Sequence, residues 1–132
     1  MRLLIDTQII IWALINPEKF STKAINLLES NDILVSHISL FEIAIKQIIG
    51  KLPELDIPIV DLITQIEQDG FNILPLQNRH IEDYDAIPIF PEHRDPFDRI
   101  LLATALSENI PILSADTNFK LYMPDVQIIM NS

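Results

Sequence analysis

Short apolar runs alternate along the chain with segments of helical periodicity, and this alternation limits the fold more than any other feature. The runs expected to form strands are Arg2–Ile5, Ile33–Val35, Phe71–Leu76, Ile112–Leu113 and Val126–Met130. Strands that are separated by helices pair in parallel, and a parallel sheet needs helices over both faces. The chain is therefore expected to form a single α/β domain over residues 1–132, with a central parallel sheet of four to five short strands between two helical layers.

Capping residues, glycines and prolines mark where the intervening helices are expected to begin and end. These helices are expected at Ile9–Leu14, Ser21–Ser30, Ser39–Gly50, Pro58–Asp69, Asn78–Ala86 and Pro96–Asn109. Ser39 is expected to start the third helix, and Asn78 to cap the fifth. A proline-studded loop is expected at residues 88–96, immediately before the last helix.

Four acidic residues stand within or directly after these apolar segments. Asp6 and Asp116 each follow a run that is expected to be a strand, whereas Glu42 and Asp98 lie in stretches expected to be helical. Burying a lone carboxylate costs too much free energy, so each must be solvated at an edge, paired with a cation or bound to a metal.

The expected topology brings these four acids toward one edge of the sheet. In open α/β sheets, sites form beyond the carboxyl ends of the strands. Asp6 and Asp116 are expected at those ends, and Glu42 and Asp98 in the first turns of helices that begin near the same edge. Four carboxylates that converge make an all-oxygen site suited to Mg²⁺ or Mn²⁺.

Each acid also has a purely local explanation. Ser39 and Glu42 fit a capping box, in which Glu42 only accepts a hydrogen bond from a backbone amide, and Glu42 could also pair with Lys46 one turn later. Asp95 and Asp98 resemble a capped helix start, and the two strand-end acids fit ordinary turns. Because caps and turns are common, no single acid predicts a site; the coincidence of all four favours one.

The charge and hydropathy of the chain point to different kinds of partner. A net charge of −10 argues against a simple nucleic-acid-binding protein, since a phosphate backbone prefers a basic surface. A metal site that concentrates the acids would reverse the sign of charge locally. The mean hydropathy of +0.26 is high for a soluble monomer and indicates an apolar surface that meets another protein.

Several classes of protein are excluded or disfavoured by composition. The absence of cysteine rules out disulfides, zinc–thiolate sites and iron–sulfur clusters, and fits the cytoplasm. No apolar stretch approaches the roughly 20 residues of a membrane helix. The segment Met1–Asp6 acquires a charge too early for a signal peptide and is expected to be a strand.

Four segments of the chain resemble the PIN-domain nucleases, and most closely the VapC-type toxins of bacterial toxin–antitoxin pairs. These segments are Leu4–Thr7, Ser39–Ala44, His93–Arg99 and Leu113–Asp116. The most specific is Asp95–Arg99, followed by Leu-Leu-Ala-Thr-Ala, and the resemblance extends over essentially the whole chain. It implies a PIN-like α/β/α fold.

The resemblance also implies roles for individual residues. The family's metal-binding and catalytic acids correspond to Asp6, Glu42, Asp98 and Asp116. The resemblance implies supporting positions beside the site at Thr7, Ser39, Asp95 and Thr117, with a capping role favoured for Ser39 and Asp95. Arg94, Arg99, Lys46 and Lys51 are candidates to contact phosphate, although each could equally be a solvated surface charge.

Two residues depart from the family pattern. Gln8 stands where related sequences often carry His, and Phe41 where they often carry Trp. Neither change removes a metal ligand, so the departures bear only on substrate contacts made by those two side chains.

The activity implied by the resemblance is that of an Mg²⁺- or Mn²⁺-dependent endoribonuclease, the toxin of a type II toxin–antitoxin system. Such an enzyme hydrolyses RNA phosphodiesters with a metal-activated water and leaves a 5′-phosphate and a 3′-hydroxyl. The implied partners are RNA, a cognate antitoxin protein and a second copy of the chain, with no membrane. Two alternatives stay open, a PIN-like module that binds a protein partner without cutting, and an enzyme that cuts DNA.

Two other classes with acidic Mg²⁺ sites do not fit. A signalling receiver domain needs adjacent acids after its first strand, but Thr7 follows Asp6. It also needs a lysine after its fifth strand, and residues 130–132 contain none. A phosphatase with an Asp-x-Asp start is excluded because Gln8 occupies the place of the second acid.

Overall fold

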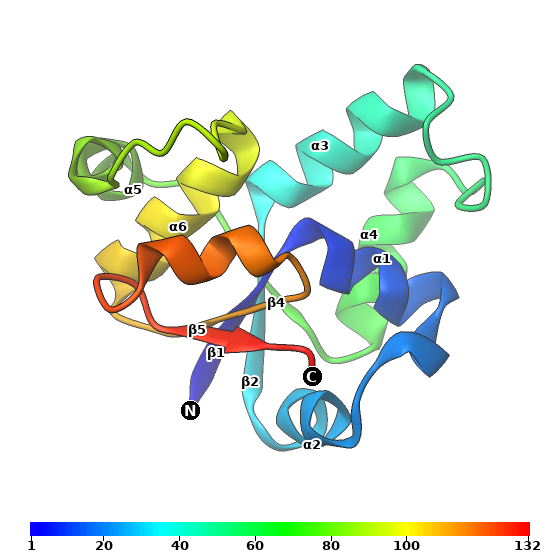
Figure 1. Cartoon of the computed structure of the whole chain (residues 1–132). Helices are drawn as coiled ribbons and strands as arrows, with labels where there is room; N and C mark the ends of the chain where they lie inside the picture. Colours follow the sequence, from blue (N-terminus) through cyan, green and yellow to red (C-terminus); the bar gives the residue numbers. More distant parts are fainter.

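Five parallel strands form the centre of the computed structural model, which describes residues 1–132 (Figure 1). The strands are β1 (Arg2–Ile5), β2 (Asp32–Ser36), β3 (Asn72–Leu74), β4 (Ile112–Ser114) and β5 (Ile128–Met130). Their order is β3-β2-β1-β4-β5, and every neighbouring pair is parallel. The predicted α/β fold with a central parallel sheet is confirmed, and β1 occupies its middle.

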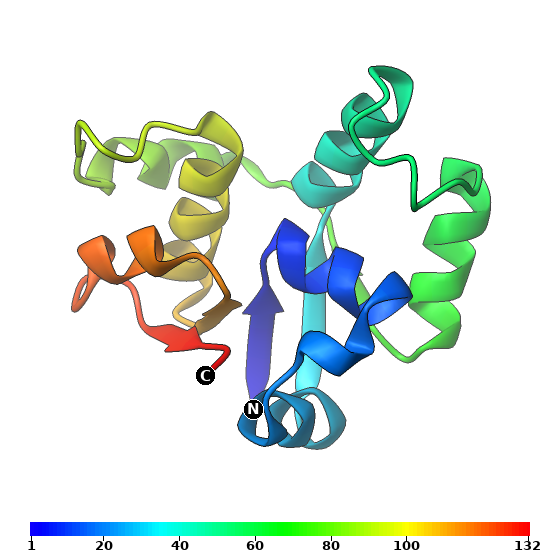
Figure 2. The same ribbon diagram turned by 45° about the vertical axis from the view of Figure 1, so that its right-hand side comes forward.

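Helices cover both faces of this sheet (Figures 1 and 2). The α-helices are α1 (Thr7–Ile15), α2 (Thr22–Ser30), α3 (His37–Ile48), α4 (Ile59–Gln68), α5 (Asn78–Glu82) and α6 (Pro96–Glu108). Three short 3₁₀ helices are η1 (Pro17–Lys19), η2 (Asp83–Ala86) and η3 (Thr117–Tyr122). None of the helices combines the length and apolar character that a membrane span requires.

The alternation of side chains along β1 divides the core into two layers, because successive residues of a strand point to opposite faces. Leu3 and Ile5 pack with side chains of α1, α2, α3 and α4. Leu4 packs on the other face with α6 and with Phe119 and Tyr122 of η3. Figure 2 shows these two groups of helices on opposite sides of the sheet. The carboxyl ends of β1 and β4 therefore open between the two layers.

Some predicted boundaries are wrong. The third helix begins at His37 and not at Ser39, since the Ser36 side chain caps it by accepting a hydrogen bond from the Ile38 amide. Ser39 is buried inside this helix. The fifth helix is capped by Gln77 in place of Asn78 and ends after five residues, where η2 follows.

The third strand is also shorter than predicted and ends at Leu74. The reason is Pro75, which has no N–H to donate to a neighbouring strand. The last strand begins at Ile128, two residues later than predicted. These differences move no element to another face or another place in the sheet.

Candidate functional site

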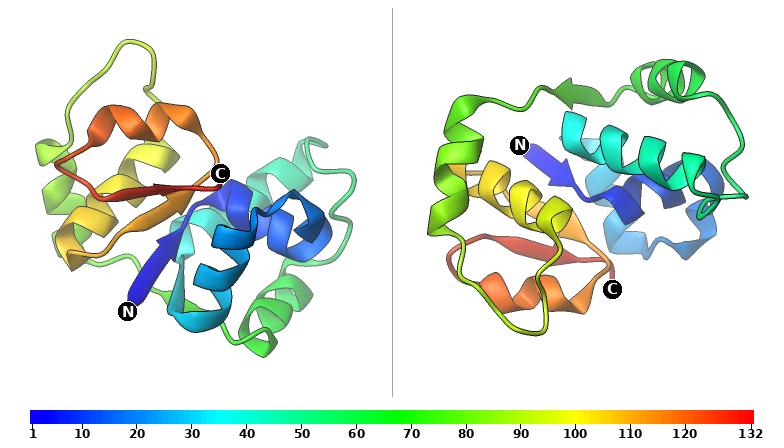
Figure 3. Two further views of the ribbon diagram at one scale, coloured as in Figure 1. Left: turned by 60° about the horizontal axis from the view of Figure 1, so that its bottom comes forward. Right: turned by 90° about the horizontal axis from the view of Figure 1, so that it is seen from above.

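A cleft of about 310 Å³ opens at the carboxyl edge of the sheet and is lined by residues of α1, α3 and α6. The right-hand view of Figure 3 looks onto this edge and shows the ribbons of these three helices around it. The residues that line it are Asp6, Thr7, Gln8, Trp12, Glu42, Lys46, Asp95, Asp98, Ala115, Asp116 and Phe119. All four acids singled out in the sequence are in this group. They come from the end of β1, from α3, from α6 and from the turn after β4, so the fold alone brings them together.

Asp6 lies deepest, at the junction of β1 and α1. Its carboxylate caps α1 by accepting a hydrogen bond from the Ile9 amide at 2.9 Å, and accepts another from the Ser114 hydroxyl at 2.6 Å. The residue is only 3% exposed. Burial raises the pKa of the Asp6 carboxyl to about 7, helped by the charges of Asp98 and Asp116 and opposed by its two hydrogen bonds.

Glu42 lies one turn further into its helix than predicted, in the second turn of α3, because that helix begins at His37. The Thr7 hydroxyl donates a hydrogen bond to Glu42 Oε1 at 2.7 Å, and the Ser39 hydroxyl lies 3.0 Å from Thr7 Oγ1. Lys46 Nζ is 3.0 Å from Glu42 Oε2, which confirms the predicted pair. Glu42 is therefore held from both sides by this chain's own groups.

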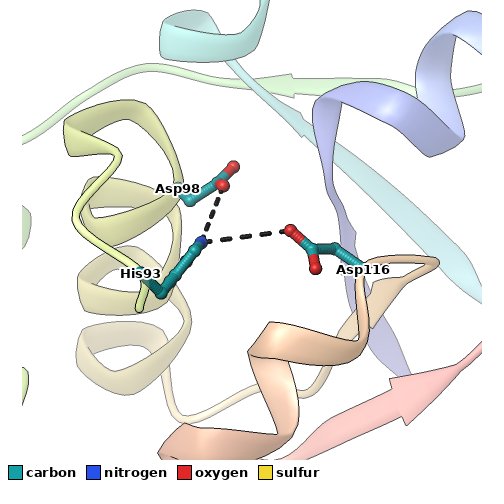
Figure 4. Close-up of side chains that lie close together, drawn as sticks. All are labelled: His93, Asp98 and Asp116. Carbon is teal, nitrogen blue, oxygen red and sulfur yellow. Dashed lines mark hydrogen bonds and ion pairs between the residues drawn. The ribbon is translucent and has the colours of Figure 1, made fainter. Parts of the chain in front are cut away.

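Asp98 and Asp116 face each other across the more open side of the cleft, with His93 between them (Figure 4). His93 Nε2 lies 2.9 Å from Asp98 Oδ2 and 4.0 Å from Asp116 Oδ2. Burial raises the pKa of the Asp98 carboxyl to about 6; the hydrogen bond from His93 opposes this rise, and the charges of Asp95 and Glu42 add to it.

His93 is itself fixed by a tyrosine on η3. Its Nδ1 lies 2.7 Å from the Tyr122 hydroxyl, and that hydroxyl donates to the His93 carbonyl oxygen at 3.2 Å. Both residues are buried. This contact ties the loop before α6 to η3, and so fixes the loop position from which His93 reaches Asp98.

His93 was not predicted as a site residue. It stands in the proline-studded loop, where no periodicity or spacing marks a buried side chain. The one available signal was its position two residues before Asp95, inside one of the four segments that resemble the PIN family. Its Nε2 lies within 4.8 Å of carboxylate oxygens of Asp98 and Asp116, so it adds a nitrogen to the atoms that could hold a metal.

Two of the remaining residues, Asp95 and Asp116, cap helices beside the cleft, whereas the Thr117 side chain is not hydrogen-bonded to the acids. The Asp95 carboxylate caps α6 through the amides of Phe97 and Asp98 at 2.8 and 3.2 Å, which confirms its capping role. Asp116 caps η3 through the Asn118 amide at 2.9 Å. Thr117 is exposed and makes no hydrogen bond with any of the acids.

Arg99 is turned away from the cleft, contrary to its prediction as a phosphate contact. Its buried guanidinium donates to the carbonyl oxygens of Pro88 and Ile87 at 2.7 and 3.1 Å, and to the Tyr84 hydroxyl at 3.1 Å. All of these partners belong to η2 and the loop after it, so Arg99 anchors that loop. Arg94 is exposed beside α6 and stays a candidate.

The two residues that depart from the family pattern lie on different parts of the surface. Gln8 lines the cleft. Phe41 is 58% exposed and packs edge-on against Phe97, with ring centroids 6.2 Å apart. Phe41 therefore sits on the outer surface where α3 meets α6.

The donor atoms of the cleft fit a divalent cation. Carboxylate oxygens are the ligands that Mg²⁺ and Mn²⁺ prefer, and one imidazole nitrogen is compatible with Mn²⁺. Lys46 is the only cationic side chain that lines the cleft. Burial is the main cause of the raised pKa of both Asp6 and Asp98, and a bound cation would lower the pKa of these carboxyl groups by favouring their ionised form.

Comparison with known proteins gives a family model and a set of similar structures. The model of the PIN domain matches residues 3–122. The fold is similar to VapBC2 from Rickettsia felis bound to a promoter DNA fragment, with 18% identity, a TM-score of 0.70 and 98% of each chain covered. DNA-bound VapBC from Salmonella typhimurium gives 17% identity and a TM-score of 0.68 over 100% of this chain and 99% of that one.

A third similar structure is VapBC-1 from nontypeable Haemophilus influenzae, with 20% identity, a TM-score of 0.64 and 98% of each chain covered. No curated protein matches the sequence. At these identities the structural similarity establishes the fold, and the family model extends from the first strand to the end of η3.

Proposed function

Because the chain belongs to the PIN-domain family, we propose that it is a metal-dependent endoribonuclease and the toxin of a toxin–antitoxin pair. The observation that supports this proposal most strongly is the convergence of Asp6, Glu42, Asp98 and Asp116 from four separate elements into one cleft. A purely structural role for each acid would not require them to share a cavity.

The residues proposed to hold Mg²⁺ or Mn²⁺ are Asp6, Asp98 and Asp116, with Glu42 beside them and the His93 nitrogen within reach. The bound ion would polarise the scissile phosphate and lower the pKa of a nearby water. Asp6 and Glu42 are already held by hydrogen bonds and by Lys46, so this part of the site needs little rearrangement to bind a cation.

Asp98 is the acid best placed to accept a proton from the attacking water. Its side chain is 21% exposed, and its Oδ2 is held by His93 whereas its Oδ1 accepts no hydrogen bond. We expect cleavage to leave a 5′-phosphate and a 3′-hydroxyl.

The proposed partners follow from the same comparison. The three similar structures are VapBC proteins, two of them bound to DNA, and we propose an antitoxin and a second copy of the chain as partners here, acting in the cytoplasm. Apolar side chains that a partner could cover are exposed at the end of α3, where Ile48 is 87% and Ile49 is 56% exposed. Patches of this kind mark sites of protein contact.

A PIN-like module that binds a partner without cutting is the second candidate. The observation that favours it is the net charge of −10, because like charges on protein and RNA repel. Metal binding would not separate the two candidates. RNA cleavage that depends on one of the acids would.

The proposed function can be tested by mapping new RNA 5′ ends in cells that briefly express the protein without an antitoxin. The matched control is Asp98→Asn, which keeps the size of the side chain. We expect discrete 5′-phosphate ends with the wild type only, and their positions would identify the RNA target. Identical end profiles, with both proteins folded, would reject RNA cleavage and support the binding module.

A further inference from the structure

A second cleft, of about 470 Å³, adjoins the acidic cleft on the side of α1 and α3. Its polar lining includes three lysines, Lys19, Lys46 and Lys51, and we call it the lysine cleft. The two clefts share Gln8, Trp12 and Lys46 as lining residues. The two clefts therefore adjoin at these side chains, with acids in the first and lysines in the second.

The three lysines come from separate elements that the fold brings together. Lys19 ends η1, Lys46 lies in the last turns of α3, and Lys51 follows that helix. Helices α1 and α3 are in contact, and Figure 1 shows them side by side. The lysine cleft is formed where η1, which follows α1, approaches the end of α3.

This concentration of positive charge is unusual in so acidic a chain. Only nine of the 132 residues are Lys or Arg, against nineteen Asp or Glu, yet three of the nine line this cleft and Glu54 is its only acid. Three of the four arginines are engaged elsewhere: Arg2 and Arg79 bind Glu108, and Arg99 anchors the loop after η2. The lysine cleft is thus the main basic surface beside the acids.

Trp12 stands at the border between the two clefts. Its indole is half-buried and packs edge-on against Phe20 with ring centroids 6.2 Å apart. Lys19 Nζ lies over the ring, 5.3 Å from its centroid, so a base stacks on that face when the ammonium turns toward a phosphate. A fixed aromatic face next to lysines is the arrangement by which proteins hold single-stranded nucleic acid, with a base on the ring and phosphates on the ammonium groups.

We propose that the lysine cleft binds the phosphates of single-stranded RNA on one side of the bond that is cut, with a base against Trp12; this inference rests on the proposed function. Lys19 and Lys51 contact the phosphates. Lys46, which is paired with Glu42, marks where the strand passes from the basic to the acidic cleft. The chain thereby attracts RNA locally in spite of its net charge of −10.

RNA fits this surface better than an acidic protein segment does. Ammonium groups on flexible stems bind phosphates as point charges and do not select one geometry, and the cleft leads directly to the acids where a phosphodiester would be cut. An acidic peptide would be repelled by the five carboxylates that line the acidic cleft, whereas an RNA strand would bring its next phosphate to the metal held there.

The test compares two double variants that remove the same charge. Lys19→Gln with Lys51→Gln alters the lysine cleft, and Lys23→Gln with Lys120→Gln alters exposed lysines that line neither cleft. Both pairs carry Asp98→Asn so that the RNA stays intact. Binding of a fluorescent single-stranded RNA is measured by anisotropy at several salt concentrations with Mg²⁺ present, and thermal melts check folding.

We expect the lysine-cleft variant to bind RNA about tenfold more weakly at low salt and to lower the slope of log affinity against log salt by about 1.4, since each lost phosphate contact on a single strand contributes about 0.7. The control should stay within about twofold of its parent, because its lysines lie away from the RNA path. Equal losses in the two variants would mean that only net charge matters, and would overturn the proposal. The proposal would also be overturned if both double variants bound RNA as tightly as their Asp98→Asn parent, or if that parent bound no measurable RNA.

Cleavage kinetics of the same variants with Asp98 intact separate this inference from the proposed function. An increase in KM of about tenfold with kcat nearly unchanged supports the lysine cleft, because only uniform substrate binding is lost. RNA binding that depends on Lys19 and Lys51 without any cleavage would reject the nuclease and keep the cleft. Cleavage with an unchanged KM would reject the cleft and keep the nuclease.

Discussion

The acidic cleft has two halves that are built in different ways. The buried half consists of Asp6 and Glu42, which are 3% and 7% exposed, and hydroxyl groups of Ser114 and Thr7 donate to their carboxylates. The open half consists of Asp98 and Asp116, whose side chains are 21% and 42% exposed. There His93 is the only side chain that bonds or pairs with the carboxylate groups themselves.

This difference indicates a division of tasks within the cleft. The hydrogen bonds of the buried half hold its carboxylates in place without a ligand. Burying these carboxylates away from water lowers the free energy of unfolding. The open half is wetter and less constrained, so substrate and metal must enter through it. Four predictions test this division, from the largest expected effect to the smallest.

Removing a charge from either half should abolish cleavage. Asp6→Asn and Asp98→Asn are each expected to lower kcat/KM by at least about 100-fold, since even residues that only support metal ligands cost 10- to 100-fold. Initial rates on the mapped RNA target provide the measurement. Asp61→Asn is the matched control, because Asp61 is an exposed acid on α4 that does not line the cleft. If only one of the two variants lost cleavage activity, the acid replaced in the other variant would not be needed for catalysis.

The pH dependence of stability should come mainly from the buried half. The pKa of Asp6 is about 7 in the folded protein against an ordinary 3.8, so folding favours the protonated acid. The contribution of Asp6 to the free energy of unfolding is complete below about pH 4 and is lost as the pH rises through 7. By linkage this amounts to roughly 4 kcal/mol at most.

Urea unfolding in EDTA at pH 5 and pH 8 measures this effect. We expect the metal-free wild type to be less stable at pH 8, and Asp6→Asn to remove much of the difference. Asp98 has a pKa raised in the same direction, so part of the dependence should persist in that variant. A wild type equally stable at both pH values would contradict the raised pKa values.

Mg²⁺ should stabilise the folded protein, and more at pH 8 than at pH 5. At a concentration about 100 times its Kd the expected gain is about 2.7 kcal/mol, because the ion binds the ionised acids of both halves. Thermal melts with and without Mg²⁺ measure the gain, and calorimetry in two buffers of different ionisation enthalpy measures proton release. Asp116→Asn should reduce both the stabilisation by Mg²⁺ and the proton release that accompanies binding. A gain that is the same at both pH values would show that the acids are not the ligands.

The smallest effect separates two threonines that were predicted to have equal roles. Thr7→Val removes the hydroxyl that donates to Glu42 and should cost about 1–3 kcal/mol, as expected when a buried charged group loses a hydrogen-bond donor. Thr117→Val, at an exposed position without such a bond, should stay within about 0.5 kcal/mol. Urea unfolding and cleavage rates are measured for both.

Thr7→Ser keeps the hydroxyl and should retain most of the activity. If Thr117→Val lost as much activity as Thr7→Val, the open half would depend on a hydroxyl that this structure does not show near the acids.

The parts of this structure that could be predicted from the sequence depend on periodicity and strand ends. Asp6 and Asp116 follow apolar runs, and a parallel sheet places the ends of such runs at one edge. Ser39 was misplaced because two serines, Ser36 and Ser39, can both cap a helix, and Glu42 three residues after Ser39 imitates a capping box. Which serine lies at the helix start depends on where β2 ends.

Contacts between distant segments could not be predicted. His93 reaches Asp98 only because Tyr122, twenty-nine residues later, holds it. Arg99 stands next to Asp98 in the chain but on another side of α6, where it binds Ile87 and Pro88. Local sequence shows that a residue is basic, but the direction of its side chain depends on packing that the pattern does not contain.

The hydrogen bond between Ser114 and Asp6 joins residues 108 positions apart, and β1 pairs with β4 through Leu4 and Ile112. During translation, Asp6 and Glu42 leave the ribosome long before the segment that completes the cleft. Non-local pairings of this kind form late. A nascent chain therefore carries Asp6 and Glu42 without a complete site until β4 and the turn that follows it have been synthesised.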